Sequence, residues 1–314
     1  MSSTMTRARV PGKTPAPAVR RSGLRDSPWW ALLFVGPTAI GLAAFYFWPI
    51  IRTAYLSLTK SGAFGGETWI GFANFAELFT TPEMIGAGIN TAVYAAVALI
   101  GIPVAIVIAS LLNTPGLKGR GVYRVLYFVP VVTMPAAIAL VWAFIYNGDY
   151  GILNQTLRLV GIQGTSWISN PSTALVAVAV VGIWSTLGTN IVIFVAGLQG
   201  IPPSLYEAAS LDGAGPIRRF FSVTLPLLSP SVFFVTVITM IASLQVFDLL
   251  YVMIPALSPA HQATTTIVTL FYNVGFVNNE RGLAAAIAIV LMIVILILTA
   301  VQFRLQRKWV HYDV

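Results

Sequence analysis

Long apolar runs, separated by short stretches that hold almost all of the charges, dominate the chain. No Asp, Glu, Lys or Arg occurs in the segments 29–51, 84–117, 125–148, 159–206, 220–247 and 282–303. A helix needs about 20 apolar residues to cross the hydrocarbon core of a bilayer. Strands of membrane β-barrels are shorter and alternate between apolar and polar residues, which these runs do not. The pattern therefore predicts an all-α membrane protein.

Clusters of Pro, Gly and Asn set the ends of these apolar segments. Trimmed at the clusters, the runs predict six transmembrane helices at about 29–51, 88–112, 123–146, 173–198, 230–254 and 283–303. Pro130, Pro135 and Pro226 each remove a backbone donor and favour a kink. The longest outer loop, about 52–87, is too short for a hydrophobic core of its own. We therefore expect one transmembrane domain over 28–314.

The basic residues predict the orientation. Fourteen of the 18 Lys and Arg residues fall before residue 26, at 118–124, at 218–219 and after residue 303. The other four, Arg52, Lys60, Arg158 and Arg281, lie on the opposite side of the predicted membrane. Cytoplasmic loops carry the excess of positive charge, so both termini are expected in the cytoplasm. Residues 1–27, which are basic and rich in Pro, Ala and Ser, are expected to form a disordered cytoplasmic tail.

Composition removes several classes of function. With 57% hydrophobic and 9% charged residues, the chain is neither a soluble globule nor disordered. The net charge of +8 is explained by membrane topology, without nucleic-acid binding. Without Cys, and with two distant His residues, neither disulfides nor a His-rich metal site are expected. Gly12-Lys13-Thr14 resembles the end of a phosphate-binding loop but lacks the earlier glycine, so any ATP must bind another chain.

The cytoplasmic loop at 202–226 carries the most specific signals. Ser204 and Glu207 have the spacing of a capping box, which predicts a short helix beginning there. Gly213 is suited to end that helix in the left-handed conformation, and Pro216 to begin a second helix. The loop is therefore predicted to contain two short helices joined by a Gly-rich turn.

This loop resembles a family motif. Glu207-Ala208-Ala209, Gly213 after three further residues, and Val223-Thr224-Leu225-Pro226 are similar to the EAA loop of ABC-importer permeases, with Val223 at the usual Ile position. Other segments resemble the carbohydrate-uptake group of that family: Trp69–Phe75, Asn90-Thr91, Arg124–Pro130 and Leu244–Asp248. The segment Ile254–Pro259 departs from that group, which often has a Thr-Gly-Gly-Pro-like sequence there. The resemblance covers about 28–314.

The resemblance implies a multi-pass permease subunit in a bacterial inner membrane, and not an enzyme. Its partners would be a second permease, two ABC ATPase subunits that hold ATP and Mg²⁺, and an extracellular solute-binding protein; no cofactor is expected on this chain. A short rigid helix seated in an ATPase cleft would transmit the ATP-driven motion. The residues expected to couple to the ATPase are Tyr206, Glu207, Ala208, Ala209, Leu211, Asp212 and Gly213. Arg218 and Arg219 either dock there too or only follow the charge rule.

A sugar site needs aromatic faces and hydrogen-bonding groups near the middle of the bilayer. The candidates are Trp142, Trp184, Asn190, Gln245 and Asp248. Each has a structural alternative, because a Trp can anchor the helix at an interface and an amide can hold two helices together. Asp248 is the one acid within a predicted span, where it needs water or a partner, and the second permease is the alternative partner.

The expected substrate is a sugar, and the family resemblance implies a di- or oligosaccharide. A permease for glycerol 3-phosphate is the runner-up, because Gly213–Phe221 and Gln262–Thr266 look similar to that subgroup. Basic residues, which a dianionic substrate favours, are absent from the interior of the predicted helices. A secondary carrier that works alone is an alternative from another class. A membrane-embedded enzyme lacks a Ser/His/Asp or metal constellation.

Overall fold

The computed structural model describes residues 28–61, 66–114 and 116–310, so the expected tail at 1–27 lies outside the described residues. The chain divides into two compact units, 1–51 and 52–314, which are described separately. The first unit contains α1 (Pro28–Leu42) and the π-helical turn η1 (Ala43–Phe47), and the boundary falls within α2 (Trp48–Ser57). The continuous apolar helix Leu32–Ser57 extends six residues beyond the predicted end at 51.

The second unit begins with a small β-hairpin, which the all-α prediction missed. Strand β1 (Thr59–Ser61) pairs antiparallel with β2 (Glu67–Trp69), and Arg52 forms an ion pair with Glu67. Helix α3 (Ala73–Thr80) follows, and its Asn74 side chain is hydrogen-bonded to the start of the hairpin. The buried Asn74 amide donates to the Ser57 carbonyl at 2.8 Å and to the Thr59 carbonyl at 2.9 Å. Three-residue strands give no alternating signal long enough to detect in the sequence.

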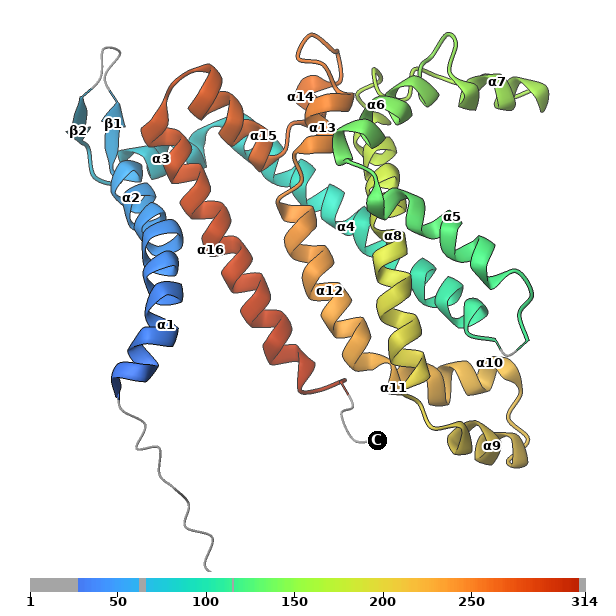
Figure 1. Cartoon of the computed structure of the whole chain (residues 1–314). Helices are drawn as coiled ribbons and strands as arrows, with labels where there is room; N and C mark the ends of the chain where they lie inside the picture. Colours follow the sequence, from blue (N-terminus) through green and yellow to red (C-terminus); the bar gives the residue numbers. More distant parts are fainter. Residues whose placement is uncertain (1–27, 62–65, 115, 311–314) are drawn as a thin grey trace, which may run out of the picture. The chain divides into compact units, whose positions relative to one another are not determined.

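Three long helices form the frame of the second unit: α4 (Pro82–Leu112), α8 (Ala174–Gln199) and α16 (Arg281–Gln306). Helices α4 and α8 lie against one another (Figure 1), with Ala105, Ala109 and Phe194 buried between them. A Cβ at Gly182 of α8 would lie 2.2 Å from the Tyr94 hydroxyl of α4, so the glycine permits this approach. Small residues at such crossings are typical of helix packing in membranes.

The segment predicted as one helix at 123–146 is broken. Helix α5 (Arg120–Val132) and helix α6 (Pro135–Ile145) meet at an angle of 105°. Thr133 and Met134 between them are extended. For Met134 the following proline favours this conformation, because the proline ring clashes with a helical backbone at the preceding residue. Pro130 lies inside α5 and does not end it. The break lies immediately before Pro135, which is the first residue of α6.

The fifth predicted span, 230–254, is also wrong as a single helix. Helix α12 (Ser229–Leu244) ends ten residues early, and α13 (Asp248–Met253) begins after a non-helical step. The Thr266 hydroxyl donates to the Val246 carbonyl at 3.3 Å and so satisfies part of the interrupted backbone. Freed backbone groups in membrane helices are commonly satisfied by such hydroxyls. Before α12 come α10 (Pro216–Arg219), the π-helical turn η2 (Phe220–Thr224) and α11 (Leu225–Leu227), bent from α12 by 67°.

The described residues contain four helices long and apolar enough to cross a membrane, or up to six if each bent pair counts as one span. The remaining elements are short: α7 (Ile152–Leu159), α9 (Pro203–Leu211), α14 (His261–Thr264), α15 (Ile267–Tyr272) and the π-helical turn η3 (Asn273–Val277). Within the second unit, α9 and α10 lie at the end opposite α7, α14 and α15 (Figure 1). The fold thus separates two candidate sites, one at each end of the long helices.

Candidate coupling and translocation sites

Helix α9 begins two residues earlier than the capping-box prediction requires. Pro203 is its first residue and Pro202 its N-cap, in the extended conformation, and no side chain caps the helix. Ser204 therefore lies inside the helix, and the predicted exchange of hydrogen bonds between Ser204 and Glu207 is wrong. A proline at the first helical position loses no hydrogen bond and presets the backbone angle, so it decides where the helix starts.

The end of α9 confirms the prediction for Gly213. Its φ is +73°, in the left-handed region. The Ala214 amide donates to the Ala209 carbonyl at 2.9 Å, and the Gly213 amide donates to the Ser210 carbonyl at 3.1 Å. These two bonds form a Schellman motif, which satisfies the last carbonyls of the helix. Pro216 then begins α10, also as predicted.

Two side-chain contacts hold α9 against the rest of the second unit. The Tyr206 hydroxyl lies 3.1 Å from the Thr224 hydroxyl of η2, and Tyr206 packs against the cluster around Phe194. Arg219 donates to the Ser210 hydroxyl at 2.9 Å. The first contact joins α9 to the π-helical turn that leads, through α11, into α12.

Most of the remaining coupling candidates face outward, whereas Ala209 is half-buried. Leu211 is 90% exposed, and Glu207, Ala208 and Asp212 are exposed as well. Within the part of the chain that the structure describes, no hydrogen bond or ion pair engages the carboxylates of Glu207 and Asp212. A short helix that presents a bare apolar side chain and two unpaired carboxylates is suited to contact another protein.

At the other end of the unit, the structure brings two of the predicted substrate residues together. The rings of Trp142 on α6 and Trp184 on α8 are in edge-to-face contact, with centroids 5.5 Å apart. The ring centroids of Tyr146 and Trp142 lie 5.2 Å apart, and the Tyr146 hydroxyl donates to the Ala177 carbonyl of α8 at 3.3 Å. The pair therefore also holds α6 against α8, and both Trp side chains stay partly exposed.

Gln245 and Asp248 flank the break between α12 and α13, and both are exposed. Asp248 is in the first turn of α13, and in the described residues no cation or donor pairs with its side chain. Gln245 lines a groove of about 460 Å³ whose other walls are apolar side chains of α15 and α16. Asn190 differs from both, because it is 91% buried on α8, as expected for a residue between helices.

The prediction missed an aromatic cluster beside Asp248. Phe247, Tyr251 and Tyr272 pack with ring centroids 5.0 to 5.2 Å apart. The hydroxyls of Tyr251 and Tyr272 lie 3.4 Å apart, and this hydrogen bond raises the pKa of Tyr272 above its ordinary value. More than twenty residues separate Phe247 from Tyr272, and no local spacing rule connects them.

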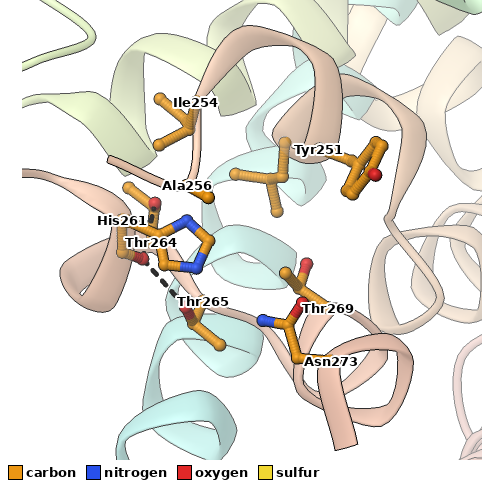
Figure 2. Close-up of a pocket in the computed structure, with 9 residues that line it drawn as sticks. Tyr251, Ile254, Ala256, His261, Thr264, Thr265, Thr269 and Asn273 are labelled. Carbon is orange, nitrogen blue, oxygen red and sulfur yellow. Dashed lines mark hydrogen bonds between the residues drawn. The ribbon is translucent and has the colours of Figure 1, made fainter. Parts of the chain in front are cut away.

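A cavity of about 240 Å³, lined by both apolar and polar side chains, lies beside this cluster between α13, α14 and α15. Figure 2 shows the side chains of His261 and Thr265 on one side of the cavity and those of Thr269 and Asn273 on the other. The Thr265 hydroxyl donates to the His261 carbonyl at 2.8 Å. In the sequence, the segment Gln262–Thr266 was distinguished only by its resemblance to the glycerol-3-phosphate subgroup, and that resemblance did not indicate a cavity. Among the described residues no group of three or more His, Asp or Glu could hold a metal.

Comparison with known proteins extends the resemblance. A profile of the family described as "Binding-protein-dependent transport system inner membrane component" matches residues 101–311. The chain is 35% identical to the sn-glycerol-3-phosphate transport system permease protein UgpA of Agrobacterium fabrum over 283 residues, or 89% of this chain and 95% of the relative. It is 33% identical to the probable ABC transporter permease protein YesP of Bacillus subtilis over 306 residues, 95% and 97% of the two chains.

Solved structures share the fold. A chain of the bacterial alginate ABC transporter, in complex with an alginate pentasaccharide-bound periplasmic protein, has a TM-score of 0.81 at 24% identity. The match covers 92% of this chain and 97% of the other. A chain of a bacterial ABC transporter involved in the import of the acidic polysaccharide alginate has a TM-score of 0.79 at 25% identity, covering 90% and 96%.

Proposed function

The chain belongs to the family of inner membrane components of binding-protein-dependent transport systems, and on that premise we propose that it imports a sugar as one of two permease subunits. It forms half of the translocation path, while separate ATPase subunits hydrolyse ATP. An extracellular solute-binding protein delivers the substrate to its outer end. The relatives named above, including a chain from an importer of a polysaccharide, support this assignment.

The observation that carries the coupling role is the exposed surface of α9. Glu207, Ala208, Leu211 and Asp212 lie at the spacing of one helix face and are exposed without a partner among the described residues, and the left-handed Gly213 ends the helix beside them. In this proposal the face is seated in the ATPase, and Glu207 pairs with a basic group there. Ala208 and Ala209 permit close approach, and Tyr206 passes the motion to η2 and α12.

The proposed topology has six spans, with α9 and both termini in the cytoplasm. The spans are the helix Leu32–Ser57, α4, the α5–α6 pair, α8, the α10–α12 segment and α16. Reporter fusions at residue 20 and at the C-terminus should read cytoplasmic, and fusions near Gly161 and Gln262 should read outside. One inverted terminus contradicts the topology.

The decisive experiment is reconstitution. The chain is expressed with the permease, ATPase and binding protein encoded beside it, purified as a complex and placed in vesicles. We expect uptake of a labelled sugar that requires both ATP inside and the binding protein outside. Uptake by this chain alone in vesicles without ATP would contradict the proposal and favour a secondary carrier.

A second substrate is favoured by one specific observation. The 35% identical relative is named as a permease for sn-glycerol 3-phosphate. The cavity beside the aromatic cluster, with His261, Asn273 and Thr hydroxyls, has donors that suit either sugar hydroxyls or a phosphate. Uptake of labelled maltose, a longer maltodextrin and sn-glycerol 3-phosphate is measured in the same vesicles. Only the class that the complex carries should be taken up, and an excess of the same substrate without label should abolish that uptake.

A further inference from the structure

A groove between α5 and α8 joins a basic end to an apolar end. The two helices cross closely at Gly188, where a Cβ would lie 2.1 Å from the Tyr127 carbonyl oxygen. Away from that crossing two hollows open, of about 590 and 300 Å³, and they share Arg124, Tyr127 and Val195. The shared residues make them one continuous groove, which lies wholly within the second unit.

The smaller hollow is polar and positively charged. Arg120 and Arg124 line it together with the amides of Asn113 and Gln199. Arg120 uses one nitrogen to donate to the Thr114 carbonyl at 2.6 Å, which leaves its other donors available. In the described ranges no carboxylate pairs with Arg120 or Arg124, so two cationic groups converge on one hollow without compensation.

The larger hollow is apolar. Along α5, Val125, Phe128, Val129 and Val132 recur at the spacing of one helix face, and Val192 of α8 forms the opposite wall. Val125 is 63% and Val132 72% exposed. The face runs eight residues beyond Arg124, about 12 Å at the helical rise, so the charged end and the far apolar end are separated by a substantial depth of bilayer.

We propose that this groove binds an anionic phospholipid, with the phosphodiester on Arg120 and Arg124 and an acyl chain along Val125, Val129 and Val132. Arginine forms paired hydrogen bonds with phosphate oxygens, and basic pockets between membrane helices on the cytoplasmic side recognise acidic headgroups. Under the proposed topology, the two arginines lie at the cytoplasmic headgroup level. The acyl chain covers an apolar surface that a headgroup alone would leave bare.

The test uses the full chain in its complex, reconstituted in nanodiscs of phosphatidylcholine and titrated with a fluorescent phosphatidylglycerol. We expect saturable binding whose affinity falls about thirtyfold in the double variant Arg120→Gln/Arg124→Gln. This factor corresponds to twice the usual free-energy contribution of one basic residue near an anionic lipid surface. Val129→Trp fills the apolar end, keeps both charges and should also reduce binding.

Two matched controls separate the groove from general effects. Arg304→Gln removes an exposed positive charge outside the groove, and Leu126→Trp enlarges an exposed residue of α5 that does not line it. Both should bind the lipid as the wild type does. Free sn-glycerol 3-phosphate should not displace the lipid, because it has no acyl chain. Displacement, or unchanged binding in the double variant, overturns the proposal.

A photoreactive residue at Val129 tests the occupant in native membranes, in a chain that keeps both arginines. An adduct of phospholipid mass supports the proposal. An adduct with another polypeptide shows that a partner permease covers the groove and overturns it. The result does not depend on which substrate is transported or on whether the ATPase docks at α9, so it stands apart from a failure of the proposed function.

Discussion

The two ends of the second unit are built in different ways. The α9–α10 segment is specified over 17 consecutive residues, Pro203 to Arg219, by a proline, a left-handed glycine and a second proline. The opposite end draws Trp142, Trp184, Asp248 and Tyr272 from α6, α8, α13 and α15. One site follows from local backbone preferences, and the other exists only because distant helices pack together.

This difference has a consequence for substitutions. A change on the exposed face of α9 should act on partner contact and leave the transmembrane packing intact, because within the described residues the side-chain hydrogen bonds that hold α9 come from Tyr206 and Ser210. A change in the Trp142 and Trp184 rings at the outer end should disturb packing and transport together, because in the proposed function the same rings serve both. The following substitutions test this contrast, beginning with the largest expected effect.

Gly213→Val should cause the largest loss. Val in the left-handed region costs about 1–2 kcal/mol, and crowding at a packed interface adds about 1–3 kcal/mol, so ATPase binding should fall about a hundredfold. The measurement is the ATPase copurified at equal permease abundance, with uptake in vesicles. Gly215→Val is the matched control: Gly215 has an ordinary φ of −67°, and both positions have open space around the added Cβ. Equal losses in the two variants would remove backbone strain as the cause.

Glu207→Ala should weaken ATPase binding by about tenfold, as expected when one partner of an interfacial ion pair is removed. Since Glu207 caps nothing, the thermal stability of the isolated permease should not change. Glu77→Ala, an exposed carboxylate of α3 at the other end of the unit, serves as the control. A drop in permease stability with normal ATPase binding would mean that Glu207 has only a structural role.

Asp248→Asn should reduce uptake about fivefold. This factor corresponds to the free-energy difference between a hydrogen bond to a charged group and one to a neutral group. Complex assembly should be retained, because the side chain pairs with nothing in the described residues. Asp149→Asn, an exposed acid in the loop before α7, should transport normally. Unchanged rate and affinity in Asp248→Asn would exclude a role for its charge in transport.

Tyr206→Phe should have the smallest effect. It removes the contact of 3.1 Å to the Thr224 hydroxyl while the ring stays packed, which costs about 1 kcal/mol, or roughly fivefold at most. The expected result is normal ATPase copurification with fewer substrate molecules imported per ATP hydrolysed. Tyr123→Phe, with an exposed ring on α5, should leave this ratio unchanged. A loss of ATPase binding would place Tyr206 in the interface instead of behind it.

Much of the fold was predictable because apolar length is a strong local signal. The helices α8 and α16 lie within three residues of the predicted bounds, and Gly213 and Pro216 adopt their predicted roles. The Ser204 cap failed because Pro202-Pro203 offered a competing start two residues earlier. A kink at Pro135 was predicted, but neither the full break between α5 and α6 nor the one between α12 and α13 was, because hydropathy averages over a helix and is insensitive to its direction.

By itself the sequence determined which segments are apolar enough for a membrane, where α9 ends and which family the chain resembles, since each depends on neighbouring residues. Only the tertiary structure decided that Trp142 meets Trp184, that Thr266 supports the carbonyl freed at Val246, and that two arginines converge beside a valine-lined groove. Those arrangements depend on how α5, α6, α8 and α13 cross. The crossings are set by close approaches such as that of Gly188 to Tyr127, which involve residues 61 positions apart in the chain.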